Sequence, residues 1–148
     1  MKQFPVRTAI KLWLKISMFT STGIVHYNTD DGSWVTVIVD QSLANYYLSL
    51  IPKYHKVKRP RWRAHVTVVR PEENPTITSN WGKHEGEVVT FVYDPIILVE
   101  KGFWWFNLWC REMEQIRLEL GISIKSRITI PPPGYTKCFH CTVGNENS

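Results

Sequence analysis

Residues 64–69, AHVTVV, and residues 137–143, KCFHCTV, share the tetrapeptide His-x-Thr-Val, and both stretches are typical of β-strands. Successive side chains of a strand point to opposite faces, so the histidine and the threonine of each motif share one face. The residues between and after them turn the other way, into apolar packing. We therefore expect each strand to be anchored from behind while it presents an imidazole and a hydroxyl in front. The four presented residues are His65 and Thr67 in the first motif and His140 and Thr142 in the second.

The sequence around the two motifs follows a loosely repeated pattern. Residues 33–40 alternate and are rich in β-branched side chains, which predicts a strand, and residues 41–51 predict a helix that Pro52 ends. In the second half we expect strands at residues 87–93, 96–99 and 102–110, a helix at residues 111–120 that stops at Gly121, and a final strand at residues 137–143. The two histidines lie 75 positions apart (140 minus 65), about half of the 148 residues. This layout predicts two lobes that face each other across a cleft and pack as a single domain over residues 1–148.

The composition is that of a folded chain with a mild excess of positive charge. Apolar residues make up 43% of the chain and aromatic residues 13%, which is enough for a hydrophobic core. The formal net charge of +5 and the isoelectric point near 9.2 favour anionic partners. Basic residues gather just before His65, where they form either a solvated loop or a surface that attracts phosphate. They are Lys53, Lys56, Lys58, Arg59, Arg61 and Arg63.

We expect neither a disulfide framework nor a membrane span. The three cysteines, Cys110, Cys138 and Cys141, do not make the even, closely spaced set of a disulfide-rich scaffold. The apolar stretch at residues 10–18 is interrupted by two lysines and is too short to cross a bilayer, and no small-residue cleavage site follows it. The simplest expectation is a reduced, cytoplasmic location without a membrane partner.

The paired motifs suit the cleavage of a phosphodiester. This reaction removes a proton from the nucleophile and supplies one to the leaving oxygen, and histidine, with an ordinary pKa of about 6.5, can do either near neutral pH. Two histidines on opposite sides of one phosphate can divide these tasks, and the sequence leaves open which does which. Thr67 and Thr142 are suited to donate hydrogen bonds to the non-bridging oxygens, where charge accumulates in the transition state. This chemistry needs no metal ion or other cofactor.

The twin motifs resemble those of the 2H phosphoesterase (LigT-like) superfamily. Residues 63–72, RAHVTVVRPE, and residues 137–145, KCFHCTVGN, are most similar to its phage-borne branch, described as RNA-repair-like proteins and as anti-CBASS nucleases that degrade cyclic oligonucleotide alarms. The resemblance implies an α+β, bilobal fold with two pseudo-symmetric lobes, antiparallel sheets lining a central cleft and helices outside. It also implies that the two motifs line the cleft as catalytic residues. A phage-encoded protein of this kind would act in the host cytoplasm.

The expected function is that of a metal-independent phosphodiesterase, with a cyclic nucleotide or oligonucleotide as the favoured substrate. Two alternatives stay open. One is the processing of RNA ends that bear a 2′,3′-cyclic phosphate. The other is a non-catalytic module that binds RNA or nucleotides, which the basic loop and the seven tryptophans would fit equally well.

Substrate contacts are expected from an aromatic ring that stacks on a base and from cations that meet phosphate. A zinc site is an alternative hypothesis, with Cys138, His140, Cys141 and the distant Cys110 as its ligands. Residues 140 and 141 point to opposite faces of their strand, however, so we do not expect these side chains to converge on one ion. Trp104, Trp105 and Trp109 are expected to fill the core of the second lobe. The candidate substrate contacts are Trp62, Arg63 and Arg70 around the first motif, and Tyr135 and Lys137 before the second.

Overall fold

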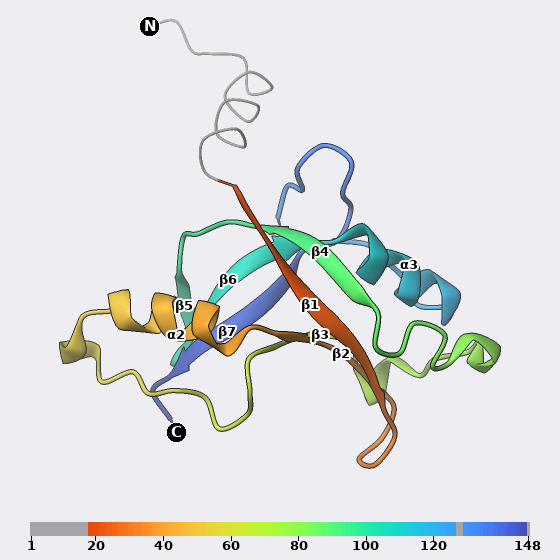
Figure 1. Ribbon diagram of the computed structural model, residues 1–148, viewed down its shortest axis with the longest axis horizontal. Coiled ribbons are helices and arrows are strands. Elements are labelled where there is room, and N and C mark those ends of the chain that lie inside the picture. Colours follow the sequence, from red (N-terminus) through yellow and green to blue (C-terminus); the bar gives the residue numbers. More distant parts are fainter. Residues whose placement is uncertain (1–17, 127–128, 148) are drawn as a thin grey trace, which may run out of the picture.

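A computed structural model describes residues 18–126 and 129–147 and shows a single antiparallel sheet that closes on itself (Figure 1). Hydrogen-bonded strands follow the order β4-β1-β2-β3-β7-β6-β5, and β4 also pairs with β6. Six strands therefore form a closed barrel, and β5 extends it as one arm of a hairpin with β6. The strands are β1 (Phe19–Asn28), β2 (Trp34–Val39), β3 (His65–Val69), β4 (Val88–Tyr93), β5 (Leu98–Glu100), β6 (Phe103–Trp109) and β7 (Phe139–Asn145), and the helices are α2 (Gln41–Leu50) and α3 (Arg111–Glu119).

This architecture contradicts the predicted bilobal fold. The two strands that carry His-x-Thr-Val were expected in separate lobes, but β3 and β7 are neighbours in one barrel, with Val66 opposite Cys141. The physical reason is β1, which the sequence pattern did not reveal. It pairs with β2 on one side and with β4 on the other, and so joins the two halves of the chain into one closed sheet.

Strand β1 is hard to detect because its sequence, FTSTGIVHYN, carries three small polar residues after Phe19 and then a glycine. Gly23 lies opposite Val39 in the antiparallel pairing of β1 with β2. A Cβ at this position would come within 2.3 Å of the Val37 side chain and 2.9 Å of the Ile38 carbonyl oxygen. The close approach of the two strands therefore depends on the missing side chain, and the residue that weakens the sequence signal is the one that the barrel requires.

The inward-facing residues of all strands but β5 form the core. Side chains alternate along each strand, and those that point inward are buried, for example Val37 on β2, Val66 on β3 and Phe106 on β6. Helix α2 inserts Tyr47 into this core, where its ring contacts Phe106 and Tyr93. The barrel is thus filled by side chains, and a binding site must lie on its outer face.

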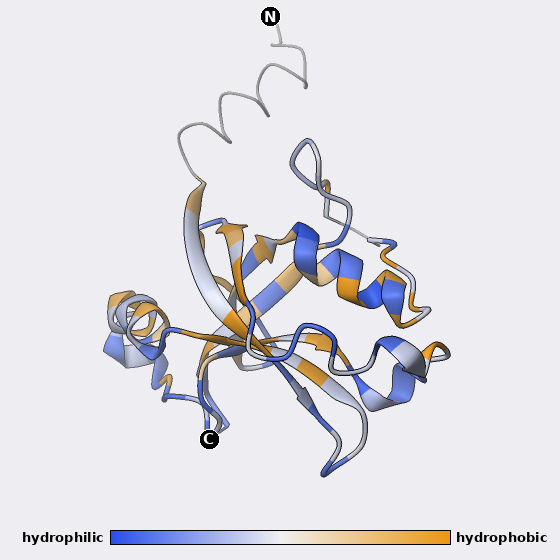
Figure 2. Ribbon diagram, turned by 45° about the vertical axis from the view of Figure 1, so that its right-hand side comes forward, coloured by the Kyte–Doolittle hydropathy of each residue, from blue (hydrophilic) through white to orange (hydrophobic). Residues whose placement is uncertain are grey.

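Helix α3 packs against the barrel through the apolar stripe that its sequence predicts. Met113, Ile116 and Leu120 are buried, and Leu118 lies off the stripe and is exposed. Figure 2 shows the result, a largely hydrophilic helix interrupted by hydrophobic residues. Gly121 follows with a φ of 77°, the left-handed conformation expected of a residue that ends a helix.

Most predicted elements are confirmed near their expected boundaries. The exceptions are the strand predicted at residues 96–99, which forms only over Leu98–Glu100, and the final strand, which runs over Phe139–Asn145. Among the described residues, no helix has the length and apolar character needed to cross a membrane. Apart from Met18, the apolar stretch at residues 10–18 lies outside the described residues, so the single domain over residues 1–148 stays a prediction.

Candidate active site

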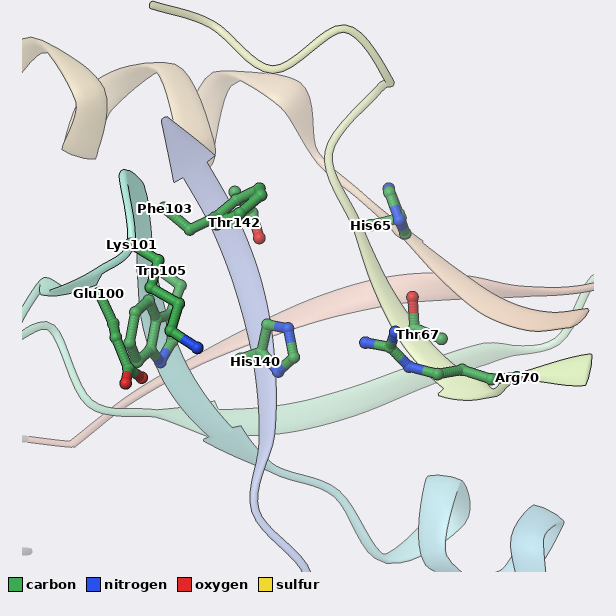
Figure 3. A pocket seen from close by; sticks show the side chains of 9 residues that line it. All are labelled: His65, Thr67, Arg70, Glu100, Lys101, Phe103, Trp105, His140 and Thr142. Atoms are coloured by element: carbon green, nitrogen blue, oxygen red, sulfur yellow. The ribbon is translucent and has the colours of Figure 1, made fainter. Parts of the chain in front are cut away.

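The adjacency of β3 and β7 brings both motifs to one cleft on the outer face of the barrel. On each strand the intervening residue points into the core, as Val66 and Cys141 do, and both are fully buried. The histidines and threonines face the other way and line a cleft of about 570 Å³ (Figure 3). Its lining residues are His65, Thr67 and Arg70 from β3 and its end, His140 and Thr142 from β7, and Glu100, Lys101, Phe103 and Trp105 from the β5–β6 hairpin.

The register of the two strands sets the arrangement of the four motif residues. Because Val66 lies opposite Cys141 in an antiparallel pair, residue 65 is placed beside residue 142, and residue 67 beside residue 140. Each histidine thus neighbours the threonine of the other motif, and the two histidines occupy diagonal positions. Diagonal neighbours in a regular antiparallel pair are about 7–8 Å apart, a separation that leaves room for one phosphate between two imidazoles.

His65 is held in one tautomer by the backbone. Its Nδ1 lies 2.7 Å from the carbonyl oxygen of Arg63. A carbonyl oxygen only accepts hydrogen bonds, so Nδ1 must carry the hydrogen. The nitrogen left to exchange a proton with a ligand is therefore Nε2.

His140 differs from His65 in its surroundings. Its ring meets Trp105 edge to face, with 6.4 Å between ring centroids, and no hydrogen bond holds it within the described part of the chain. The ring is open to the cleft, but burial within the cleft walls disfavours the charged form and lowers the pKa of His140. Positive charges on Arg70, His65 and Lys137 lower this pKa further. At neutral pH the ring is thus more fully neutral than an ordinary histidine, as a proton acceptor needs to be.

Two cations extend into the cleft from opposite sides. Figure 3 shows the guanidinium of Arg70 reaching from β3 toward β7, and the ammonium of Lys101 reaching from the β5–β6 turn toward His140. Neither side chain forms a salt bridge with a described carboxylate, so both charges are available to an anion.

A buried ion pair supports the end of β3 that carries Arg70. Arg117 donates to both carboxylate oxygens of Glu73, at 3.0 and 2.6 Å, and to the carbonyl oxygen of Val68 at 2.7 Å. Glu73 in turn accepts a hydrogen bond of 3.0 Å from the backbone N–H of Arg70. The pair therefore fixes the chain on both sides of the last residue of β3 and sets the direction in which Arg70 leaves the strand.

Of the five substrate contacts predicted from sequence, two lie at the cleft or beside it and three do not. Arg70 lines the cleft, and Lys137 lines an adjoining hollow of about 230 Å³ that shares Thr67, Arg70 and His140 with it. The other three are not among the lining residues. Trp62 is 68% exposed, Arg63 contributes its carbonyl oxygen to His65, and Tyr135 packs its ring against Arg111.

The hairpin residues of the cleft were missed by the sequence analysis. Trp105 was expected in the core with Trp104 and Trp109; Trp109 is buried and Trp104 packs against the core, but Trp105 lines the cleft. The available signal was Asn107, a polar residue within the aromatic run FWWFNLW. It shares the parity of Trp105 and lies opposite His140 on β7, as Trp105 lies opposite Thr142, so this face of β6 is the cleft face.

The zinc set considered from sequence does not converge. Cys141 lies in the core, whereas His140 faces the cleft from the next position. Burial raises the pKa of the Cys141 thiol, and likewise that of Cys110, to about 12, so both are protonated at neutral pH. In the described ranges, no group of three or more His, Cys, Asp or Glu side chains is arranged to hold a metal ion.

No family model matches the chain, and no curated protein or solved structure does either. The resemblance to 2H phosphoesterases therefore depends on the two tetrapeptides. The barrel that β1 closes differs from the bilobal fold implied by that resemblance.

Proposed function

We propose that the protein is a metal-independent phosphodiesterase of the two-histidine type, acting on a nucleotide phosphodiester. The observation that carries the proposal is the pairing of β3 with β7, which sets two His-x-Thr motifs side by side on the floor of one cleft. Two imidazoles that share one anion site, with a hydroxyl beside each, are the groups that in-line displacement at phosphorus needs.

The reaction divides between the histidines. A ribose 2′-hydroxyl or a water attacks phosphorus, and His140, whose lowered pKa favours its neutral form, accepts the proton of the nucleophile. His65, protonated at Nε2, gives that proton to the leaving oxygen. Attack by a 2′-hydroxyl on a 3′–5′ linkage forms a 2′,3′-cyclic phosphate and frees a 5′-hydroxyl. Opening of the cyclic phosphate by water uses the same two groups with their roles reversed.

Threonines and cations stabilise the transition state in this mechanism. Thr67 and Thr142 donate hydrogen bonds to the non-bridging oxygens, on which negative charge increases. Arg70 and Lys101 approach the same region from the two ends of the cleft and neutralise that charge. Every step is thus supplied by side chains, and the reaction should proceed in the presence of a chelator.

The substrate class we favour is a cyclic nucleotide or oligonucleotide. A cleft of about 570 Å³ has the size of a site for one nucleotide unit and its phosphate. The resemblance to phage-borne 2H phosphoesterases suggests that such a substrate is a cyclic oligonucleotide alarm of host defence, which the enzyme would degrade in the host cytoplasm.

A second candidate, cleavage at an RNA end, is favoured by the basic loop before β3. Residues 41–71 contain seven Lys or Arg and no Asp or Glu, whereas the rest of the chain holds 11 Lys or Arg and all 13 Asp and Glu. The six loop cations are exposed and form no salt bridge with a described carboxylate. Tyr54 and Trp62, also exposed, stand among them. A longer nucleic acid strand would find both phosphate and base contacts there.

The deciding experiment is a turnover assay with EDTA present, on cyclic mono-, di- and trinucleotides and on RNA ending in a 2′,3′-cyclic phosphate. We expect cleavage of at least one substrate, and its loss in the double variant His65→Ala, His140→Ala. His26→Ala is the matched control, because His26 lies on β1, pairs with Glu85 and does not line the cleft. Cleavage that survives the double replacement, or that stops in EDTA, would refute the mechanism. Binding without cleavage of any substrate would favour a non-catalytic module.

A further inference from the structure

The end of the cleft opposite β3 is built by a tight hairpin. Lys101 and Gly102 connect β5 to β6 and both have positive φ, 51° and 82°, as in a two-residue turn of type I′. Lysine seldom adopts this conformation, and such residues concentrate at ligand sites. The turn sets Glu100 opposite Phe103, and Trp105 follows on the same face. The hairpin therefore presents a carboxylate, an ammonium and two aromatic rings to one cleft.

The two rings are available to a ligand. Phe103 is 47% exposed although it lies in a strand, and Trp105 is half-buried at the side of the cleft. The indole N–H of Trp105 donates to Asn107 at 3.0 Å, which fixes the ring without a ligand. A fixed aromatic ring beside a phosphate site, with a second exposed ring near it, offers a flat base a stacking surface at little entropic cost.

Phosphate binding explains why cations line the cleft, but it does not explain why Glu100 does. In a cleft suited to phosphate, an acidic side chain repels the anion. Glu100 forms no salt bridge with a described cation, Lys101 beside it included. A carboxylate has two acceptor oxygens and no donor, so its complement is a group with two adjacent N–H donors. Among the bases, guanine carries such a pair on its Watson–Crick edge, N1–H and the N2 amino group.

We propose that Glu100, Phe103 and Trp105 form a nucleobase subsite that prefers guanine. The rings stack on the base, and the Glu100 carboxylate accepts from N1–H and from the N2 amino group. Lys101, which points from the turn toward His140, meets the phosphate of the same nucleotide (Figure 3). The subsite rests on the proposed function in one respect, that the cleft binds nucleotides with their phosphate at the two histidines.

Calorimetric binding of small nucleotides tests the subsite without turnover. The probes are GMP, IMP, AMP, UMP and ribose 5-phosphate, at one fixed ionic strength. We expect GMP to bind about tenfold or more tightly than AMP and UMP, because two hydrogen bonds to a carboxylate are at stake, with IMP in between because it keeps only N1–H. Glu100→Gln should abolish the preference for GMP and leave ribose 5-phosphate bound at least as well.

Two further variants complete the test. Phe103→Leu keeps an apolar side chain at an exposed position but removes the aromatic face on which a base can stack. We expect it to weaken the binding of all four nucleotides about fivefold and to leave the binding of ribose 5-phosphate unchanged. Asp31→Asn removes an equal charge on the β1–β2 hairpin, outside the cleft, and should change nothing. Equal affinities for all probes, no binding at all, or an unchanged GMP preference in Glu100→Gln would overturn the subsite. Cleavage without base preference would refute the subsite alone, and selective GMP binding without cleavage of any diester would refute the phosphodiesterase alone.

Discussion

Replacing Arg117 with methionine should destabilise the protein by roughly 2–4 kcal/mol and should also weaken catalysis. The Arg117 side chain is 6% exposed and donates to the Glu73 carboxylate and the Val68 carbonyl oxygen. Removing one partner of a buried pair costs about 3–5 kcal/mol, because the other charge is left unpaired. We expect a cost around and somewhat below the lower end of that range because the Glu73 side chain is 27% exposed, so water can reach it in the variant.

A second variant distinguishes the energy of the Arg117–Glu73 ion pair from the packing of the Arg117 side chain. Glu73→Gln keeps the shape of the side chain and removes its charge. If the ion pair is the source of the effect, Arg117→Met should cost clearly less in the Glu73→Gln background than in the wild type, by about 1 kcal/mol or more. Urea unfolding monitored by circular dichroism gives the free energies of unfolding for this double-mutant cycle. Equal costs in the two backgrounds, or a cost of Arg117→Met below about 1 kcal/mol in the wild type, would refute the reasoning.

The same pair predicts a pH dependence of stability. Burial alone would raise the pKa of Glu73, but hydrogen bonds from Arg117 and from the backbone of Arg70 hold it below its ordinary value of 4.5. The stabilisation is therefore present above pH 4.5 and is lost as the pH falls through the lower pKa of the folded state. The difference in stability between wild type and Glu73→Gln should shrink over that range. A difference that stays constant down to pH 3 would contradict the assignment.

Three further outcomes are expected. Burial alone would lower the pKa of His84, but hydrogen bonds to Glu87 and Glu119 raise it above 6.5, so its stabilisation is present below pH 6.5 and disappears as the pH rises through the raised value. Melting temperatures from pH 6 to pH 9 should show this loss in the wild type and not in His84→Gln. Gly23→Ala should destabilise the barrel by about 2 kcal/mol or more in urea unfolding, because its Cβ would come within 2.3 Å of a β2 side chain. Arg70→Ala should raise KM about tenfold and reduce the salt dependence of kcat/KM, whereas an unchanged KM would place the phosphate elsewhere.

The faces of individual strands were predictable from sequence because side-chain alternation is a local property. His65 and Thr67 face the cleft and Val66 faces the core, as the motif required, and the second motif behaves in the same way. The helix stripe on α3 was predictable for the same reason. These features follow from the periods at which side chains repeat along a strand and along a helix, and the sequence pattern shows which period applies to each segment.

The closure of the sheet was not predictable, because it depends on contacts between distant segments. The repeated order of elements suggested two lobes, and only β1, with its polar residues 20–22 and its glycine, reveals one barrel. The hairpin subsite was missed for a related reason. Phe103 and Trp105 share the parity of Asn107, but Trp109, also at an odd position, is buried, so alternation along the aromatic run does not show which rings face the cleft until the pairing with β7 is known.

The most direct test is a crystal structure of the protein with a non-cleavable analogue, a dinucleotide whose attacking ribose lacks its 2′-hydroxyl. We predict one phosphate between β3 and β7, with its oxygens about 2.6–3.2 Å from Nε2 of His65 and from a ring nitrogen of His140. A phosphate that contacts only one of the two imidazoles, or that binds outside this cleft, would contradict the central claim.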